Sequence, residues 1–325
     1  MEDLFGFALL QLPMLAIKDI LNMMTAFELL NICDISKRGT KLVQLYTGPQ
    51  RFNIDFYANG ELKIFIDGTE MTYQFRRTVN KEDHGKTRFY VPENDQITEE
   101  KLFYAEDPIG EQMKIFDRVK ECLRCNIKNL LVSFSRYRDR NREMTDWLAP
   151  LASTFKDVSI FGMNPPKDDV NFFIEQIGVQ KTLRFELTTK IPPKIPKVLE
   201  YLTIPNGQWL SLEDFMQIDC PDMWINHSEL TNQDLNKFLK SWKLSECHRN
   251  TRHIVISVKR LEDFDEIFEG VEHKDPDPIR AFELSKNKTF VNAGVDIKRD
   301  DGAIANVFPL RRDDTNFFRM RVFRK

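Results

Sequence analysis

The chain has 325 residues, of which 42% are hydrophobic, including 26 phenylalanines, and this composition excludes an intrinsically disordered protein. Its 47 Lys and Arg residues against 50 Asp and Glu residues give a net charge of −3, so no global positive field favours a nucleic-acid partner. The 5 cysteines are odd in number and scattered, which favours reduced thiols in the cytoplasm or nucleus.

The first apolar stretch, residues 4–17, is not typical of a signal sequence. The leader Met1-Glu2-Asp3 is acidic where a basic region is expected, and Gln11 and Pro13 interrupt the apolar run. No later stretch reaches the ~18 uninterrupted apolar residues that a membrane span needs. We therefore expect neither secretion nor a membrane partner.

Residues 10–46 predict three short helices. The first opens at Pro13, and its apolar stripe comprises Met14, Ile17, Ile20, Leu21 and Met24. Thr25-Ala26-Phe27-Glu28 is a capping box that starts the second, which is apolar nearly all round. The third is expected from about Asp34 to Tyr46, where Gly48-Pro49 stops it.

This helical module is too small to stand alone. A unit of under ~40 residues rarely stays folded without a disulfide, a metal or a partner, and this one has one cysteine. Either another protein docks on it, or it folds as a cap onto the chain behind it. Periodicity alone leaves these two alternatives open.

Beyond Pro49 the apolar residues alternate, which predicts a small antiparallel meander over residues 49–108. Asn59-Gly60 and Asp67-Gly68 are hairpin signals between the alternating runs. Residues 80–100 are polar and rich in turn formers, so we expect a long loop around one short strand there.

From residue 109 the pattern predicts alternating strands and helices. Apolar runs near residues 127, 157, 182, 200, 223 and 252 recur every ~20 to 30 residues, the spacing at which strand–helix units stack into a leucine-rich-repeat-like solenoid. A doubly wound parallel sheet fits the same alternation, but no strand ends in a glycine-rich phosphate loop. Strands over 280–286, 289–310 and 317–324 are expected to close one end of the array.

Catalytic motifs are missing from the sequence. It has no G-x-S-x-G, H-E-x-x-H or phosphate-binding loop pattern. Cys122 and Cys125 have C-x-x-C spacing, but they fall within a predicted helix and no second pair follows. The basic run Arg136–Arg142 contains an acid and is typical of a solvated loop. We expect a non-enzymatic protein with no catalytic residue, no metal and no cofactor.

Two segments resemble a known family. Leu12-Pro13, the apolar first helix, the Thr25 start of the second helix and Ser36-Lys37-Arg38 at the third resemble the F-box, the segment that docks substrate receptors on the Skp-type adaptor of cullin-RING ubiquitin ligases. LNKFLKSW at 235–242, RHIVISV at 252–258, VDIKRDDGAIANV at 295–307 and FFRMRVF at 317–323 resemble the F-box-associated type-2 domain of nematode proteins.

The resemblance implies an α/β protein with a three-helix F-box at 1–48, an antiparallel β linker at 49–108, and a leucine-rich-repeat-like domain with flanking antiparallel strands at 109–325. It implies a receptor subunit of an SCF-type ubiquitin ligase with an unidentified protein substrate. The residues that match the family's apolar positions are expected to face the adaptor. They are Leu12, Pro13, Ile17, Ile20, Leu21, Leu29, Leu30 and Val43. The bulky anchor that many F-boxes carry after the third helix is missing.

For target binding, the strand surface and strand-to-helix loops of a solenoid are the usual recognition surface. Trp209, Trp224 and His227 are the candidates by position. The alternative function is a solenoid that binds protein or RNA outside any ligase, with the N-terminal helices as a structural cap.

Overall fold

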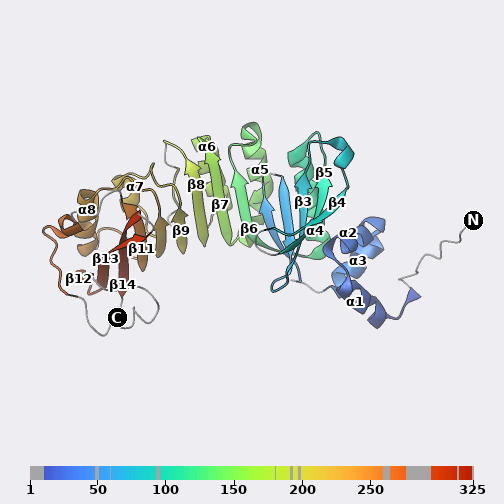
Figure 1. The fold of residues 1–325 in the computed structure, drawn as a ribbon, viewed down its shortest axis with the longest axis horizontal. Coiled ribbons are helices and arrows are strands. Elements are labelled where there is room, and N and C mark those ends of the chain that lie inside the picture. Colours follow the sequence, from blue (N-terminus) through green and yellow to red (C-terminus); the bar gives the residue numbers. More distant parts are fainter. Residues whose placement is uncertain are drawn as a thin grey trace, which may run out of the picture. The chain divides into compact units, whose positions relative to one another are not determined.

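The protein forms two compact units, Met1–Leu131 and Val132–Lys325, in a computed structural model (Figure 1). The residues described are 11–47, 51–58, 60–92, 96–179, 181–190, 193–196, 199–258, 264–275, 294–312 and 315–323. No helix among these residues is long and apolar enough to cross a membrane. The overall class is α/β, as expected from the sequence.

The first unit begins with the three predicted helices, which we call the N-terminal helical module. They are α1 (Met14–Met23), α2 (Ala26–Ile35) and α3 (Lys37–Tyr46). The capping box is confirmed, because the Glu28 amide donates to Thr25 Oγ1 at 3.2 Å and the Thr25 amide donates to Glu28 Oε2 at 2.8 Å. The predicted start of the third helix was wrong by three residues, since Ser36 caps α3 by accepting from the Gly39 amide.

Replacing Thr25 with alanine is expected to lower the free energy of unfolding of the first unit by about 1 kcal/mol, because the Glu28 amide at the start of α2 loses its acceptor. Urea unfolding followed by far-UV circular dichroism measures the change. Thr25→Ser keeps the oxygen and should retain most of the stability; an equal loss in both variants would show that the cap contributes nothing.

The rest of the first unit is a sheet with one long helix. Its strands lie in the order β6-β1-β2-β3-β5-β4. The elements are β1 (Asn53–Tyr57), β2 (Glu61–Phe65), β3 (Met71–Arg77), β4 (Thr87–Tyr90), β5 (Ile97–Phe103), α4 (Pro108–Leu123) and β6 (Asn126–Ser133), which crosses into the second unit. The meander β1–β2–β3 is antiparallel, as predicted. Asn59 of the first predicted turn lies outside the described residues.

Two features of the first unit differ from the sequence-based expectation. Residues 80–100 were expected to hold one strand, but β4 and the start of β5 both lie there, and β5 pairs in parallel with β3. The sequence pattern did not predict β5, because its inward-facing residues, Thr98 and Glu100, are polar. The boundary between units falls at residue 131 rather than 108, because α4 packs on α2 and α3 and β1 pairs with β6.

The second unit contains the strands that the sequence predicts near residues 157, 182, 200, 223 and 252. They are β7 (Asp157–Met163), β8 (Thr182–Thr188), β9 (Tyr201–Ile204), β10 (Asp222–Ile225) and β11 (His253–Val258). All of them pair in parallel and in sequential order (Figure 1). A doubly wound sheet reverses its strand order, so this part of the chain does not have that topology. The solenoid-repeat character stays a prediction.

The helical elements of the second unit connect these strands. They are η3 (Arg138–Arg140), α5 (Asn141–Leu148), η4 (Ala149–Thr154), α6 (Lys167–Ile177), α7 (Leu212–Met216), α8 (Asn232–Lys243) and η5 (Phe264–Phe268). The buried residues of β7, β8, β9 and β10 alternate with more exposed ones, as in Leu183, Phe185 and Leu187 of β8. Phe238 of α8 continues this core, with its ring centroid 5.0 Å from that of Phe215 and 6.2 Å from that of Phe318.

Antiparallel strands follow β11, as predicted for the C-terminal segment. They are β12 (Val295–Lys298), β13 (Ile304–Arg312) and β14 (Thr315–Phe323), in the order β11-β14-β13-β12. The hairpin signal Asp301-Gly302 lies between β12 and β13, and Gly302 has a φ of 92°. The strand expected at 280–286 and the start of the one expected at 289–310 lie outside the described residues.

Candidate functional site

The eight residues that the F-box resemblance assigns to the adaptor interface differ in how far they are buried. Ile17, Leu21, Leu29, Leu30 and Val43 are buried within the first unit, whereas Leu12 and Ile20 are half-buried and Pro13 is exposed. The five buried side chains therefore form the inner face of the helical module. Periodicity found the apolar stripe but could not tell whether the body of the protein or a partner covers it.

The cover for this inner face comes from the sheet and from α4. The ring of Phe27 packs edge-on against Tyr73 and Phe75 of β3, with centroids 5.7 and 5.0 Å away. On the α4 side, Arg118 forms an ion pair with Asp34 and donates to the Leu30 carbonyl at 3.4 Å. The module therefore packs on the rest of the first unit through both apolar and charged contacts.

Two further side chains fasten the module through its backbone. Arg51 donates to the carbonyls of Leu21, Asn22 and Met24 at 3.1, 2.8 and 3.2 Å, which satisfies acceptors left open at the end of α1. Gln44 of α3 donates to the Glu121 carbonyl at 2.8 Å. These bonds fix α1 and α3 on the rest of the first unit.

The helical module keeps several large hydrophobic side chains exposed. Its exposed large hydrophobic side chains are Met14, Leu15, Met23, Ile35 and Leu45. Leu15 is 71% exposed and Leu45 is 68% exposed, and neither was among the adaptor-facing candidates. The sequence signal that could have found them is an apolar residue lying off the main helical stripe. Exposed apolar side chains of this size are available for contact with another protein.

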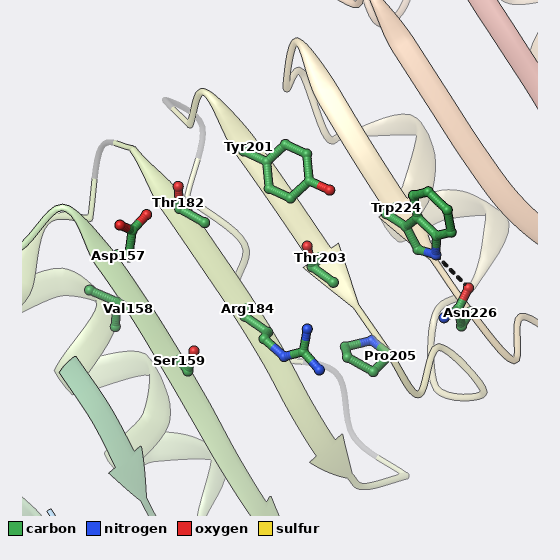
Figure 2. Close-up of a pocket in the computed structure, with 10 residues that line it drawn as sticks. All are labelled: Asp157, Val158, Ser159, Thr182, Arg184, Tyr201, Thr203, Pro205, Trp224 and Asn226. Atoms are coloured by element: carbon green, nitrogen blue, oxygen red, sulfur yellow. Dashed lines mark hydrogen bonds between the residues drawn. The ribbon is translucent and has the colours of Figure 1, made fainter. Parts of the chain in front are cut away.

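The second candidate surface is the outward face of β7, β8, β9 and β10, which we call the strand face. Cross-strand register places Ser159, Arg184, Thr203 and Trp224 in one row across these strands. Figure 2 shows that these side chains stand on the same side of the sheet as Tyr201 and Asn226. Successive rows of this kind give an extended polar and aromatic surface.

A shallow hollow of about 470 Å³ lies on the strand face. Its lining includes Asp157, Ser159, Arg184, Tyr201, Trp224 and Asn226. The Trp224 indole donates to Asn226 Oδ1 at 2.7 Å, so the ring is held in one orientation (Figure 2). Tyr201 is 39% exposed, and Arg184 is paired with Glu186. This arrangement suits an extended ligand more than a deeply enclosed small molecule.

The three predicted target-binding residues lie in different environments. Trp224 is half-buried on the strand face and lines the hollow. His227 is exposed in the turn after β10, with a φ of 51°. Trp209 is only 7% exposed and packs edge-on against Phe185, so its placement as an exposed anchor was wrong. Sequence position alone could not separate a core tryptophan from a surface one.

The basic run Arg136–Arg142 is largely engaged within the protein. Arg138 donates to the Met163 and Asn164 carbonyls, Arg140 pairs with Glu143, and Arg142 pairs with Asp169 at 3.1 Å. These contacts neutralise the run or tie it to backbone, which leaves little free charge to bind a nucleic-acid phosphate.

The cysteines of the C-x-x-C pair are buried, as are the other three. Burial raises the pKa of the Cys125 thiol, and it raises that of Cys220 to about 11. Thiols in this state are poor nucleophiles and poor metal ligands. Over the described ranges, no three His, Cys, Asp or Glu side chains come together as a metal site would require.

Comparison with known proteins gives one family match. Residues 190–256 match the family described as F-box associated, and this segment contains β9, α7, β10, α8 and the first part of β11. It includes Tyr201 and Trp224 of the strand face. A relative from Caenorhabditis elegans, the Skn-1 dependent zygotic transcript 15 protein, is 31% identical over 64 residues. That alignment covers 19% of this chain and 18% of the relative. No solved structure matches the chain.

Proposed function

We propose that the chain is the substrate-recognition subunit of an SCF-type ubiquitin ligase. The premise is that residues 190–256 match the F-box-associated family. The N-terminal helical module would bind the Skp-type adaptor, and the strand face would bind the protein target. In this role the chain joins two proteins and performs no chemistry itself. The observation that carries the proposal is a three-helix module with exposed apolar side chains in a chain with this family match.

The adaptor would dock on the outer face of the module. Leu15 and Leu45 are the exposed apolar side chains best suited to contact it, because they can be covered without moving the helices. Burial of such side chains supplies most of the binding free energy at interfaces of this kind, and a few central residues dominate. Adaptor binding through the inner face would instead require the module to separate from the sheet and α4 of the first unit.

The test uses the full chain and purified Skp-type adaptor. Leu15→Asp and Leu45→Asp are each expected to weaken adaptor binding at least tenfold, measured by biolayer interferometry, without changing the unfolding midpoint. Val79→Asp is the matched control, because Val79 is 86% exposed in the same unit but lies outside the module. Ile17 and Leu30 are unsuitable positions, since a buried charge there would unfold the module.

The alternative is a protein-binding module outside any ligase, with the helices as a cap. The burial of Leu21, Leu29 and Val43 against the body favours this alternative. If the wild-type chain binds no Skp-type adaptor, or if Val79→Asp weakens binding as much as Leu15→Asp does, the ligase assignment fails.

A further inference from the structure

Two arginines on β14 extend the strand face beyond the hollow. Cross-strand register places Arg319 opposite Val255 and Arg321 opposite His253. Val255 in turn pairs with Trp224. Residues directly paired across a sheet point to the same side, so both arginines share the face on which Trp224 stands. The Trp224 ring also lies 6.3 Å from that of Phe317, two residues before Arg319.

Arg319 is held in a fixed position. Its guanidinium carbon lies 5.2 Å from the centroid of the Phe308 ring, and its Nη2 lies 3.2 Å from Nε2 of His253. Burial, reinforced by the charge of Arg319, lowers the pKa of His253 to about 4. The imidazole is therefore neutral near pH 7 and accepts from the guanidinium. A stacked and hydrogen-bonded arginine presents its remaining donors in one orientation.

The charge of this arginine pair is not balanced locally. Within the part of the chain that the structure describes, neither Arg319 nor Arg321 forms an ion pair with a carboxylate. The neighbouring carboxylate, Asp222, is paired with Arg252 at 2.5 Å. Arg319 Nε is buried and has no hydrogen-bond partner among the described residues. Burial, and then repulsion from Arg321, lowers the pKa of Arg319.

A half-buried arginine without a counter-charge is unfavourable unless a ligand supplies the anion. The guanidinium fork matches the two oxygens of a carboxylate or phosphate. We propose that Arg319 and Arg321 bind an anionic side chain of a target peptide, which lies along the strand face toward Trp224. This inference rests on the proposed target-binding role of that face and adds the chemical class of the target, an acidic peptide segment.

Fluorescence anisotropy on the full chain tests the site with three labelled peptides. The probes are a six-glutamate peptide, a six-glutamine peptide of the same length, and a glycine–serine peptide with one phosphoserine. We expect one or both anionic peptides to bind at least tenfold more tightly than the glutamine peptide, with affinity falling as salt rises. The two anionic probes distinguish a carboxylate from a phosphate as the preferred group.

Arg319→Gln and Arg321→Gln are each expected to weaken binding of the anionic peptide at least tenfold. Arg142→Gln is the matched control, because Arg142 lies on α5, away from the strand face, and is already paired with Asp169; it should change the affinity less than twofold. Arg319→Lys keeps the charge without the fork and should give an intermediate affinity. Thermal unfolding checks the fold, and Arg319→Gln should not lower the midpoint, since it removes an unbalanced charge.

Adaptor binding by the same variants separates this inference from the proposed function. All of them should bind the Skp-type adaptor like the wild type. A chain that binds the adaptor but neither anionic peptide overturns the anion site and leaves the receptor role standing. A chain that binds an anionic peptide through Arg319 but no adaptor overturns the ligase role and leaves the site. Equal affinity of Arg142→Gln and Arg319→Gln for the peptide also overturns the site.

Discussion

Between pH 7 and pH 4, protonation linked to His248 is expected to lower the free energy of unfolding of the second unit by about 3 kcal/mol. Replacing His248 with asparagine should abolish this part of the loss. The His248 ring is 2% exposed and lies 4.6 Å from the Phe215 ring and 5.0 Å from the Phe238 ring. This burial lowers the pKa of His248 to about 4, below the value near 6.5 of an unfolded chain.

The sign follows from which state binds the proton. Because the folded pKa is lowered, the unfolded state takes up the proton first as the pH falls below about 6.5, and stability is lost until the folded pKa near 4 is reached. Asparagine does not titrate and tolerates the positive φ of 51° at this position. The variant should be less stable at pH 7, because the ring is lost, but its stability should depend less on pH.

Tryptophan fluorescence measures this effect selectively. All four tryptophans, at positions 147, 209, 224 and 242, lie in the second unit, so urea unfolding followed by their emission reports that unit alone. His84→Asn, at an exposed site in the first unit, is the control and should leave the pH dependence unchanged. His253 of the same unit also has a pKa lowered to about 4, so part of the pH dependence should persist in His248→Asn. A pH dependence as large as that of the wild type would show that His248 does not contribute.

The double substitution Arg76→Ala and Arg88→Ala is expected to destabilise the first unit by about 3 kcal/mol, because it leaves a buried carboxylate without a partner. Glu100 on β5 has no exposed surface, and Arg76 contacts it at 3.5 Å. Arg88 of β4 pairs with its other oxygen. We expect the low end of the range for broken buried ion pairs, since both arginines are about half exposed.

A third substitution tests the cause of that loss. Adding Glu100→Gln to the double variant removes the charge and should recover a large part of the stability, measured by urea unfolding and circular dichroism. Hydrogen exchange should show the loss at β4 and β5. If the triple variant is no more stable than the double one, the loss comes from packing of the arginine stems rather than from the unpaired charge.

Local patterns predicted much of the secondary structure. The capping box at Thr25 and Glu28 and the alternation in TLRFELT placed α2 and β8 correctly, because each is determined by residues close in sequence. The strand β5 was missed because Glu100 is buried with arginines from two other strands, a compensation that a hydrophobicity pattern cannot reveal.

The candidate surfaces were predicted less well. Which side of α1 faces the body depends on contacts with residues far along the chain, such as the bonds from Arg51 to the end of the helix. Trp209 and Trp224 have similar sequence surroundings but opposite environments, one packed on Phe185 and the other on the strand face. The arginine pair on β14 becomes notable only when register sets it beside His253.

The bonds from Arg51 and Gln44 also determine how much of the chain can be transplanted. A fusion that carries only residues 1–48 would cut away Arg51, the Glu121 carbonyl and the rings of Tyr73 and Phe75. It would expose the inner face of the three helices to water. The smallest portion that keeps these contacts would therefore be the whole first unit, residues 1–131, and proteins that carry the helices alone should aggregate.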